Sequence, residues 1–120
     1  MFFWIFMLMM NLLIPGIMII MGRLFQRKPP KKINNVYGYR TTRSTKSEEA
    51  WRFAHIYFGR LWFRWGRVLL LVSVLFMTAV AGRNIEIVGT AGGILCSLQC
   101  VVMILPIIPT ERALKQQFGD

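Results

Sequence analysis

The side chains that could do chemistry gather in residues 34–67, the one long stretch of the chain that is not built for lipid. Arg40 is the residue best suited to binding, because the planar donors of a guanidinium match a carboxylate or a phosphate. Glu48 or Glu49 is a candidate partner for Arg40 within the chain. The competing interpretation is a structural Arg40 that ties the loop to the start of a helix or to a lipid phosphate.

The candidate binding motif extends to both sides of Arg40. Its residues are Asn34, Tyr37, Gly38, Tyr39, Arg40, Thr41, Ser44, Glu48, Glu49, Trp51 and His55. Gly38 between two tyrosines suggests a turn or a close approach of the backbone. His55 could titrate near neutral pH, but a lone His on a helix is more often a hydrogen-bonded structural residue. Trp51 is more typical of a core or interfacial position than of a ligand platform.

Residue patterns of known catalytic and metal sites are missing from the sequence. It contains no GxSxG, HExxH or P-loop pattern. Cys96 and Cys100 are four residues apart in an apolar run, a spacing that favours packing inside a helix bundle over a disulfide. We therefore predict no catalytic residue, no metal ligand and no cofactor.

Two runs without a single charge, residues 2–21 and 87–110, are long enough to cross a bilayer as helices. A third run reaches that length if it begins near Leu61 and if Arg64 and Arg67 extend to the headgroups. The sequence thus predicts an all-α membrane protein with three transmembrane helices, at residues 1–22, 61–82 and 87–109. A short tail, residues 110–120, is expected to be helical from Glu111 to about Gln117. The first span is interpreted as retained, because no basic residue precedes Arg23.

Residues 23–60 are predicted to form a basic cytoplasmic loop that ends in an amphipathic helix along the membrane surface. Thr45 and Glu48 fit a capping box at the start of this helix, with Ser47 as the alternative cap. The helix is expected to bend into the second span at Gly59 or Gly66.

Polar and small residues inside the spans indicate how the helices pack. Asn11 is expected to hydrogen-bond to a neighbouring helix, and Pro15 followed by Gly16 predicts a kink. Small residues recur every four positions on two strips of the third span, Gly89, Gly93 and Ser97 on one and Gly92, Cys96 and Cys100 on the other. Such strips favour close packing within one molecule, with a homo-oligomer as the weaker alternative.

Charge sets the expected partners and orientation. The chain has 15 Lys and Arg against 5 Asp and Glu, and twelve of the basic residues lie between Arg23 and Arg67. Nucleic-acid binding is one explanation of a net charge of +10. A lipid bilayer with anionic headgroups explains it better, because apolar spans flank the basic block, and we predict no direct contact with nucleic acid. The positive-inside rule places the loop and the C-terminus in the cytoplasm and the N-terminus outside.

The motif resembles a known family. The stretch Asn34-x-x-Tyr37-Gly38-Tyr39-Arg40-Thr41, followed by Ser44, Glu48, Glu49, Trp51, Ala54, His55 and Gly59, resembles the SdpI/YfhL family of bacterial membrane proteins. The tail from Pro106 to Leu114 is similar to the C-terminal end of that family. Ile33 and Thr42 stand where the family commonly has prolines, and His55 stands where it often has Asn.

The resemblance implies a protein of the bacterial cytoplasmic membrane, and the missing catalytic patterns favour a non-catalytic one. The member that gives the family its name confers immunity against a secreted killing peptide, and it signals by holding a transcriptional repressor at the membrane. The expected function is therefore immunity against a membrane-active toxin peptide, capture of a cytoplasmic repressor, or both. A small membrane transporter or an envelope-maintenance protein is the alternative.

Overall fold

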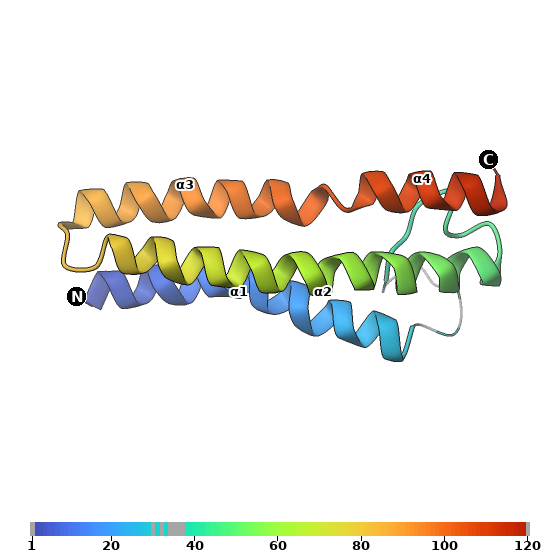
Figure 1. The fold of residues 1–120 in the computed structure, drawn as a ribbon, viewed down its shortest axis with the longest axis horizontal. Helices are drawn as coiled ribbons and strands as arrows, with labels where there is room; N and C mark the ends of the chain where they lie inside the picture. The colour runs from blue at the N-terminus through green and yellow to red at the C-terminus, as the bar shows by residue number, and fades with distance from the viewer. Residues whose placement is uncertain (1, 30, 32, 34–37, 120) are drawn as a thin grey trace.

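The computed structural model describes residues 2–29, 31, 33 and 38–119, which fold as an elongated helix bundle. Its helices are α1 (Phe2–Arg27), α2 (Glu48–Ala79), α3 (Ile85–Ile104) and α4 (Ile107–Phe118). α2 runs antiparallel to α1 and α3, and α4 continues in the direction of α3 (Figure 1). The bundle is 52 Å long and 22 Å wide in both other directions. The start of α1 and the end of α4 therefore lie at opposite ends of the bundle (Figure 1).

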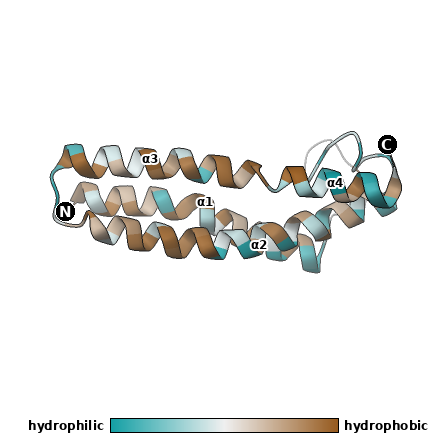
Figure 2. Cartoon of the chain, turned by 45° about the horizontal axis from the view of Figure 1, so that its top comes forward, coloured by the Kyte–Doolittle hydropathy of each residue, from teal (hydrophilic) through white to brown (hydrophobic). Residues whose placement is uncertain are grey.

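The outer faces of the helices are made for lipid. Within the described residues, three helical segments are long and apolar enough to cross a membrane: Phe2–Arg27, Glu48–Ala79 and Ile85–Phe118, the last of which joins α3 and α4. Large apolar side chains such as Leu71 and Ile94 point outward, a surface that a water-soluble monomer rarely shows. Apolar residues dominate α1, α2 and α3, whereas hydrophilic residues gather at the end that holds α4 (Figure 2). The predicted all-α fold with three membrane-spanning helices is confirmed.

α2 is one continuous helix of 32 residues, and the described residues show no separate amphipathic helix before it. Neither Gly59 nor Gly66 interrupts the helix, which continues from its amphipathic start into the apolar span. Both glycines instead face α1, where a Cβ atom on either of them would press against atoms of that helix. The glycines thus serve the packing of α2 against α1.

The start of α2 is capped by Ser47. Its hydroxyl accepts a hydrogen bond from the backbone N–H of Ala50 at 3.0 Å, so the alternative cap is confirmed and the capping box of Thr45 and Glu48 is wrong. Thr45 instead donates its hydroxyl to the carbonyl of Thr41 at 2.8 Å. That bond belongs to the turn before the helix, which leaves Ser47 as the residue next to the free backbone amides.

Backbone contact between α1 and α2 depends on Gly22 and Gly59. A Cβ on Gly22 would lie 2.6 Å from the backbone nitrogen of Phe63, and a Cβ on Gly59 would lie 2.6 Å from the carbonyl oxygen of Gly22. Only glycine permits this approach. Gln26 adds a hydrogen bond across the crossing, because its side-chain amide lies 3.2 Å from the carbonyl of Gly59.

The two strips of small residues on α3 behave differently. Gly92 is buried, and a Cβ there would clash with Met7 of α1. Gly93 has no heavy atom within 4 Å of its Cβ position, and Ser97 is exposed. Gly92 therefore packs within the molecule, but Cys96 on the same strip is only partly buried and Cys100 is exposed. On the other strip Gly93 and Ser97 face outward.

All three spanning helices meet at a polar cluster of Asn11, Ser73 and Gln99, each of which is buried. Pro15 has no N–H, so the carbonyl of Asn11 lacks the donor that a regular helix would supply. Gln99 supplies it from α3 at 2.7 Å, and the same amide donates to the hydroxyl of Ser73 on α2 at 2.7 Å. The side chain of Asn11 donates to the carbonyl of Met7 in its own helix at 2.9 Å, so the predicted side-chain bond to a neighbouring helix is wrong. The link to α3 is made by the backbone carbonyl of Asn11. α1 also changes direction along its length, as the proline predicts (Figure 1).

The third span is divided at Leu105 and Pro106, where α3 ends and α4 follows. Carbonyls in the last turn of a helix lack donors from their own helix. Trp62 of α2 satisfies one of them, because its indole N–H donates to the carbonyl of Met103 at 3.0 Å. The predicted helical tail is confirmed as α4, which begins at Ile107, earlier than expected.

Candidate functional site

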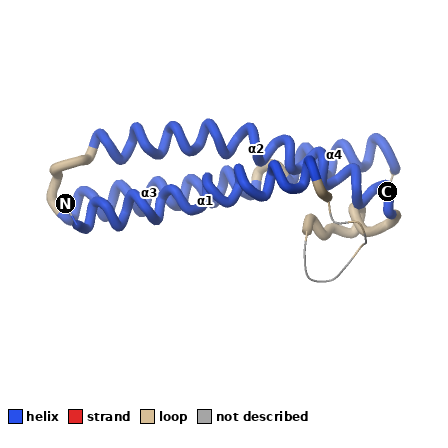
Figure 3. Tube along the Cα trace, turned by 90° about the horizontal axis from the view of Figure 1, so that it is seen from below, coloured by secondary structure: helices blue, strands red, loops and turns tan. Residues whose placement is uncertain are grey.

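The motif loop, residues 38–47, lies against the end of the bundle where α2 begins and α4 ends; we call this the loop end (Figure 3). Gly38 has a φ angle of 110°, a backbone conformation that side-chain-bearing residues rarely adopt. A Cβ on Gly38 would also clash with the imidazole of His55 and come within 3.3 Å of the Trp51 ring. The glycine of the motif is therefore required by its conformation and by its close contact with α2.

His55 connects the start of the motif loop to α2 through its two ring nitrogens. Nε2 accepts the backbone N–H of Tyr39 at 2.8 Å, and Nδ1 lies 2.7 Å from the carbonyl oxygen of Trp51. Because Nε2 must accept and Nδ1 must donate, the ring is neutral and carries its proton on Nδ1. His55 is fully buried and precedes the apolar part of α2 that begins near Leu61. This burial lowers the pKa of His55 below its ordinary value of 6.5, which keeps the neutral form in place.

Glu111 of α4 joins the motif loop to the C-terminal helix. One carboxylate oxygen accepts the hydroxyls of Tyr39 and Thr41, both at 2.9 Å. The other lies 3.6 Å from a guanidinium nitrogen of Arg43. Burial, and then the hydrogen bond to Glu111, raise the pKa of the Tyr39 phenol well above its usual value of 10.0, so Tyr39 remains a donor. A single carboxylate thus binds three side chains of the loop.

Thr41 and Ser44 close the loop into a turn by reciprocal hydrogen bonds. The N–H of Thr41 donates to the hydroxyl of Ser44 at 2.8 Å, and the N–H of Ser44 donates to the hydroxyl of Thr41 at 3.1 Å. The Ser44 hydroxyl also lies 3.0 Å from the carbonyl of Tyr39. Ser44 is fully buried, so its role is to shape the turn and not to contact a ligand.

An aromatic core beneath the loop fixes its position on the bundle. Its buried members are Phe25, Tyr39, Ala50, Ala54, Phe58 and Leu114, which come from α1, the loop, α2 and α4. The rings of Tyr39 and Phe58 have centroids 4.7 Å apart, and Phe25 packs edge-on against His55 at 4.9 Å. Trp51 is also fully buried, which agrees with a core residue and not with a ligand platform.

Arg40 is exposed, whereas Tyr39 before it is buried. Arg40 lines a cleft of about 610 Å³, which we name the Arg40 cleft. The other residues that line it are Thr41, Thr42, Arg43, Lys46 and Glu111. The lining holds three cations and one carboxylate, and that carboxylate already pairs with Arg43. In the described part of the chain no ion pair joins Arg40 to Glu48 or Glu49.

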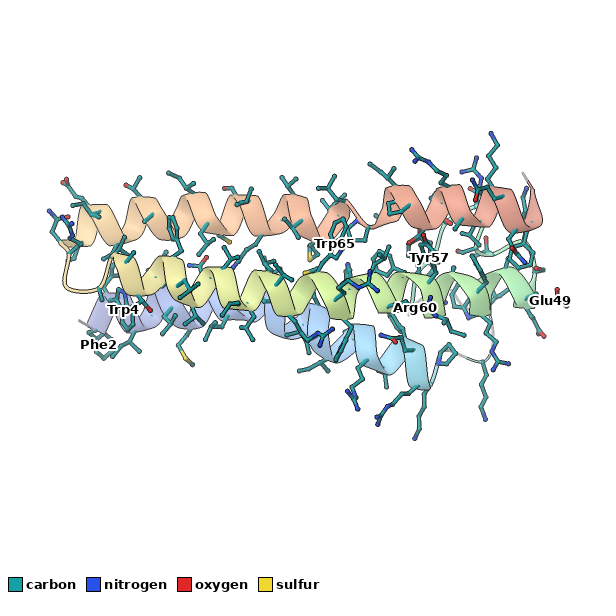
Figure 4. The ribbon with its side chains drawn as sticks, in the orientation of Figure 1. Phe2, Trp4, Glu49, Tyr57, Arg60 and Trp65 are labelled. Carbon is teal, nitrogen blue, oxygen red and sulfur yellow. The ribbon has the colours of Figure 1, made fainter. Side chains whose placement is uncertain are left out.

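Glu48 and Glu49 lie in a different cleft, of about 660 Å³, which also involves the end of α1. The other residues that line it are Arg27, Lys28, Pro29, Lys31 and Arg52. Both glutamates are in the first turn of α2, where a negative charge is favourable near the free backbone amides. Glu49 is near the start of α2, at the tip of the loop end (Figure 4). The two glutamates therefore stabilise the helix start and are not on the Arg40 cleft.

The structure brings most residues of the predicted binding motif together, but most of them hold the loop in place and do not face an open cleft. Gly38, Tyr39, Thr41, Ser44, Trp51 and His55 hold the loop on the bundle, while Arg40 lines an open cleft. Asn34 and Tyr37 lie outside the described residues. Glu111 was missed by the sequence reasoning as a site residue. The sequence did contain a hint of this role: Glu111 lies in the tail that resembles the family, and the motif loop is rich in hydroxyl and guanidinium donors that a carboxylate could accept.

Comparison with known proteins finds relatives that cover most of the chain. The model of the SdpI/YfhL protein family matches residues 31–110, which include the described part of the motif loop, α2 and α3. A protein of Bacillus subtilis (strain 168), named Uncharacterized protein YfhL, is 37% identical over 109 residues, which cover 88% of this chain and 89% of that protein. No solved structure matches the chain. The chain therefore belongs to the SdpI/YfhL protein family.

Proposed function

We propose that this protein is a non-catalytic binding protein of the bacterial cytoplasmic membrane, which captures an acidic segment of a cytoplasmic regulator in the Arg40 cleft. The exposure of Arg40 carries the proposal. Its neighbours in the motif pack in the core or bind Glu111, whereas the Arg40 guanidinium is exposed on an open cleft. A planar fork of donors in such a position suits the carboxylates of a partner.

The proposed orientation places the loop end in the cytoplasm. Twelve of the 15 basic residues lie between Arg23 and Arg67, a stretch that comprises the end of α1, the link to α2 and the first part of α2. Basic segments beside a span are retained on the cytoplasmic side. An odd number of spans then puts the start of α1 outside and α4 inside, next to the motif loop. A cytoplasmic protein would meet the Arg40 cleft in this orientation.

The charge of the cleft supports an acidic partner. Arg40, Arg43 and Lys46 face a single carboxylate, that of Glu111, so the lining has an excess of positive charge. An excess of one sign attracts a partner of the other sign and speeds its association. The same excess disfavours basic partners, which gives the cleft a simple form of selectivity.

Protection against a membrane-active toxin peptide is the second part of the proposal. It is supported by the resemblance to the SdpI/YfhL family and by the apolar outer faces of the spans, where such a peptide would meet the protein. Deletion of the gene is expected to sensitise cells to such a peptide, and the wild-type gene is expected to restore resistance. Unchanged sensitivity across a panel of membrane-active peptides would remove this part of the proposal.

Capture is tested on the purified protein in detergent with a fluorescent hexaglutamate peptide, whose binding is followed by anisotropy. Removing one guanidinium from the cleft by Arg40→Ala is expected to weaken binding about fivefold, the equivalent of roughly 1 kcal/mol. The control is Arg52→Ala, which removes an exposed cation outside the Arg40 cleft. Equal weakening by both substitutions would show general charge attraction, and no effect of Arg40→Ala would remove Arg40 from the site.

A further inference from the structure

The outer face of the bundle contains a groove between α2 and α3, which does not depend on the Arg40 cleft. It has a volume of about 460 Å³ and is lined by Arg64, Trp65, Val68, Leu69, Val72 and Val102. Trp65 lies on the side of α2 that faces α3 (Figure 4). We call this feature the α2–α3 groove.

The groove has one polar end and an apolar length. Arg64, Val68 and Val72 follow one another at intervals of four residues, so they line the same side of α2. At a rise of about 1.5 Å per residue, Val72 lies about 12 Å along the helix axis from Arg64. A cation thus stands at one end of an apolar track that runs into the membrane-spanning part of the bundle.

Arg64 is available for a ligand, in contrast to the arginine three positions later. The guanidinium of Arg67 lies over the ring of Phe63 at 4.5 Å from its centroid. Arg64 is exposed, and the described residues provide it with no carboxylate partner. Its planar donors suit a phosphate. Trp65 lies next to Arg64, and tryptophan side chains are favoured at the headgroup level of a bilayer.

We propose that the α2–α3 groove binds one anionic phospholipid, with its phosphate on Arg64 and an acyl chain along Val68, Val72 and Val102. The shape and the charge of the groove favour this occupant. A lipid has an anionic head on an apolar tail, which matches a guanidinium at the end of an apolar track. The lining contains no carboxylate that would neutralise Arg64. The bound lipid would fill the space between α2 and α3 and so support their packing.

The test is native mass spectrometry of the full chain, released from detergent in the presence of palmitoyl-oleoyl phosphatidylglycerol or phosphatidylcholine. We expect the wild-type chain to retain one phosphatidylglycerol in preference to phosphatidylcholine. Arg64→Gln is expected to weaken that binding about fivefold, the effect of one guanidinium at a membrane surface. Arg67→Gln is the matched control and is expected to leave it unchanged, because Arg67 stacks on Phe63 outside the groove.

Filling the groove provides an independent arm of the test. Val102→Trp and Val68→Trp each place a large side chain in the track and are expected to abolish the retained lipid. Val68 is 59% exposed, so its substitution is compatible with folding even if Val102→Trp is not. Equal losses from Arg64→Gln and Arg67→Gln would overturn the proposal, as would equal retention of the two lipids. A dimer that disappears in Val68→Trp would assign the groove to a second copy of the chain and would also overturn it.

Discussion

Glu111 binds the motif loop with one carboxylate, which accepts hydroxyls from Tyr39 and Thr41 and pairs with Arg43. Glu111→Gln removes the negative charge and keeps the size of the side chain. We expect a loss of about 1–3 kcal/mol of unfolding free energy, because hydrogen bonds to charged groups contribute more than neutral ones. Denaturant unfolding in micelles, followed by circular dichroism, measures this loss.

The control for Glu111→Gln is Arg112→Gln, which changes the charge of the next, exposed residue of α4. Its effect is expected to stay within about 0.5 kcal/mol. If Glu111→Gln is as stable as the wild type, the carboxylate does not hold the loop.

His55 makes the attachment of the loop sensitive to pH. Its pKa is lower in the folded than in the unfolded protein, so the unfolded state binds more protons just below pH 6.5. Stability contributed by neutral His55 is therefore complete above this value and is lost as the pH falls through the window below it. We expect the melting temperature to fall from about pH 7.5 to about pH 5.5.

His55→Gln separates this effect from the titration of carboxylates. A glutamine oxygen can still accept the N–H of Tyr39, but it does not titrate, and His55 is the single histidine of the chain. We expect the melting temperature of the variant to change less over this range than that of the wild type. Parallel curves for the two proteins would contradict the role of His55.

Some residue roles could be predicted from the sequence and others could not. The structural reading of His55 and Trp51 needed only their residue types and the helix pattern, and burial confirms it. The partner of the motif loop could not be predicted, because Tyr39 and Glu111 are 72 residues apart. Only the fold shows that α4 returns to the loop end, where Glu111 is nearer to the donors than Glu48 or Glu49.

At the scale of helices, Gln99 of α3 compensates for a backbone hydrogen bond that Pro15 removes from α1. Proline leaves the carbonyl of Asn11 without a helical donor, and Gln99 supplies one from α3. Gln99→Leu is expected to reduce stability by about 0.5–2 kcal/mol in the wild type. It should cost less in a Pro15→Ala background, where the new N–H can satisfy the same carbonyl. A double-mutant cycle measured by unfolding in micelles tests the coupling, and equal costs in both backgrounds would refute it.

The crossing of α1 and α2 depends on the absence of a side chain at Gly59. Gly59→Leu would force the helices apart, since even a Cβ at this position would lie 2.6 Å from the carbonyl oxygen of Gly22. We expect a loss of at least about 1–3 kcal/mol, typical of an overpacked interior. Gly93→Leu is the control, because nothing lies within 4 Å of its Cβ position. Similar stability of the two variants would contradict this account of the crossing.

The membrane-spanning helices could be predicted, because uncharged runs of this length have few other stable forms. Which helices pack against each other could not be predicted. Small-residue strips were visible on α3, but Gly22 and Gly59, which lie in backbone contact, are isolated in sequence and gave no repeat. The continuity of α2 was also missed. Arg60, Arg64 and Arg67 resembled a boundary, yet charged side chains on the outer face do not interrupt the backbone hydrogen bonds of a helix.

The dimensions of the whole molecule explain why the loop end can act outside the lipid. The bundle is 52 Å long, whereas the hydrocarbon core of a bilayer is about 30 Å thick and the complete bilayer about 40–45 Å. Part of the bundle must therefore project into water. The hydrophilic residues gather at the end of α4, so the motif loop and the Arg40 cleft are at the projecting end (Figure 2).

We propose that three helices cross the membrane and present the Arg40 cleft to the cytoplasm. The most direct measurement is labelling of single cysteines with a membrane-impermeant maleimide, in a background with Cys96→Ser and Cys100→Ser. Thr42→Cys probes the cleft and Arg83→Cys probes the turn at the other end, and both positions are exposed. We expect Arg83→Cys to react in intact cells and Thr42→Cys to react only after the membrane is permeabilised. Reaction of Thr42→Cys in intact cells, at the rate of Arg83→Cys, would contradict it.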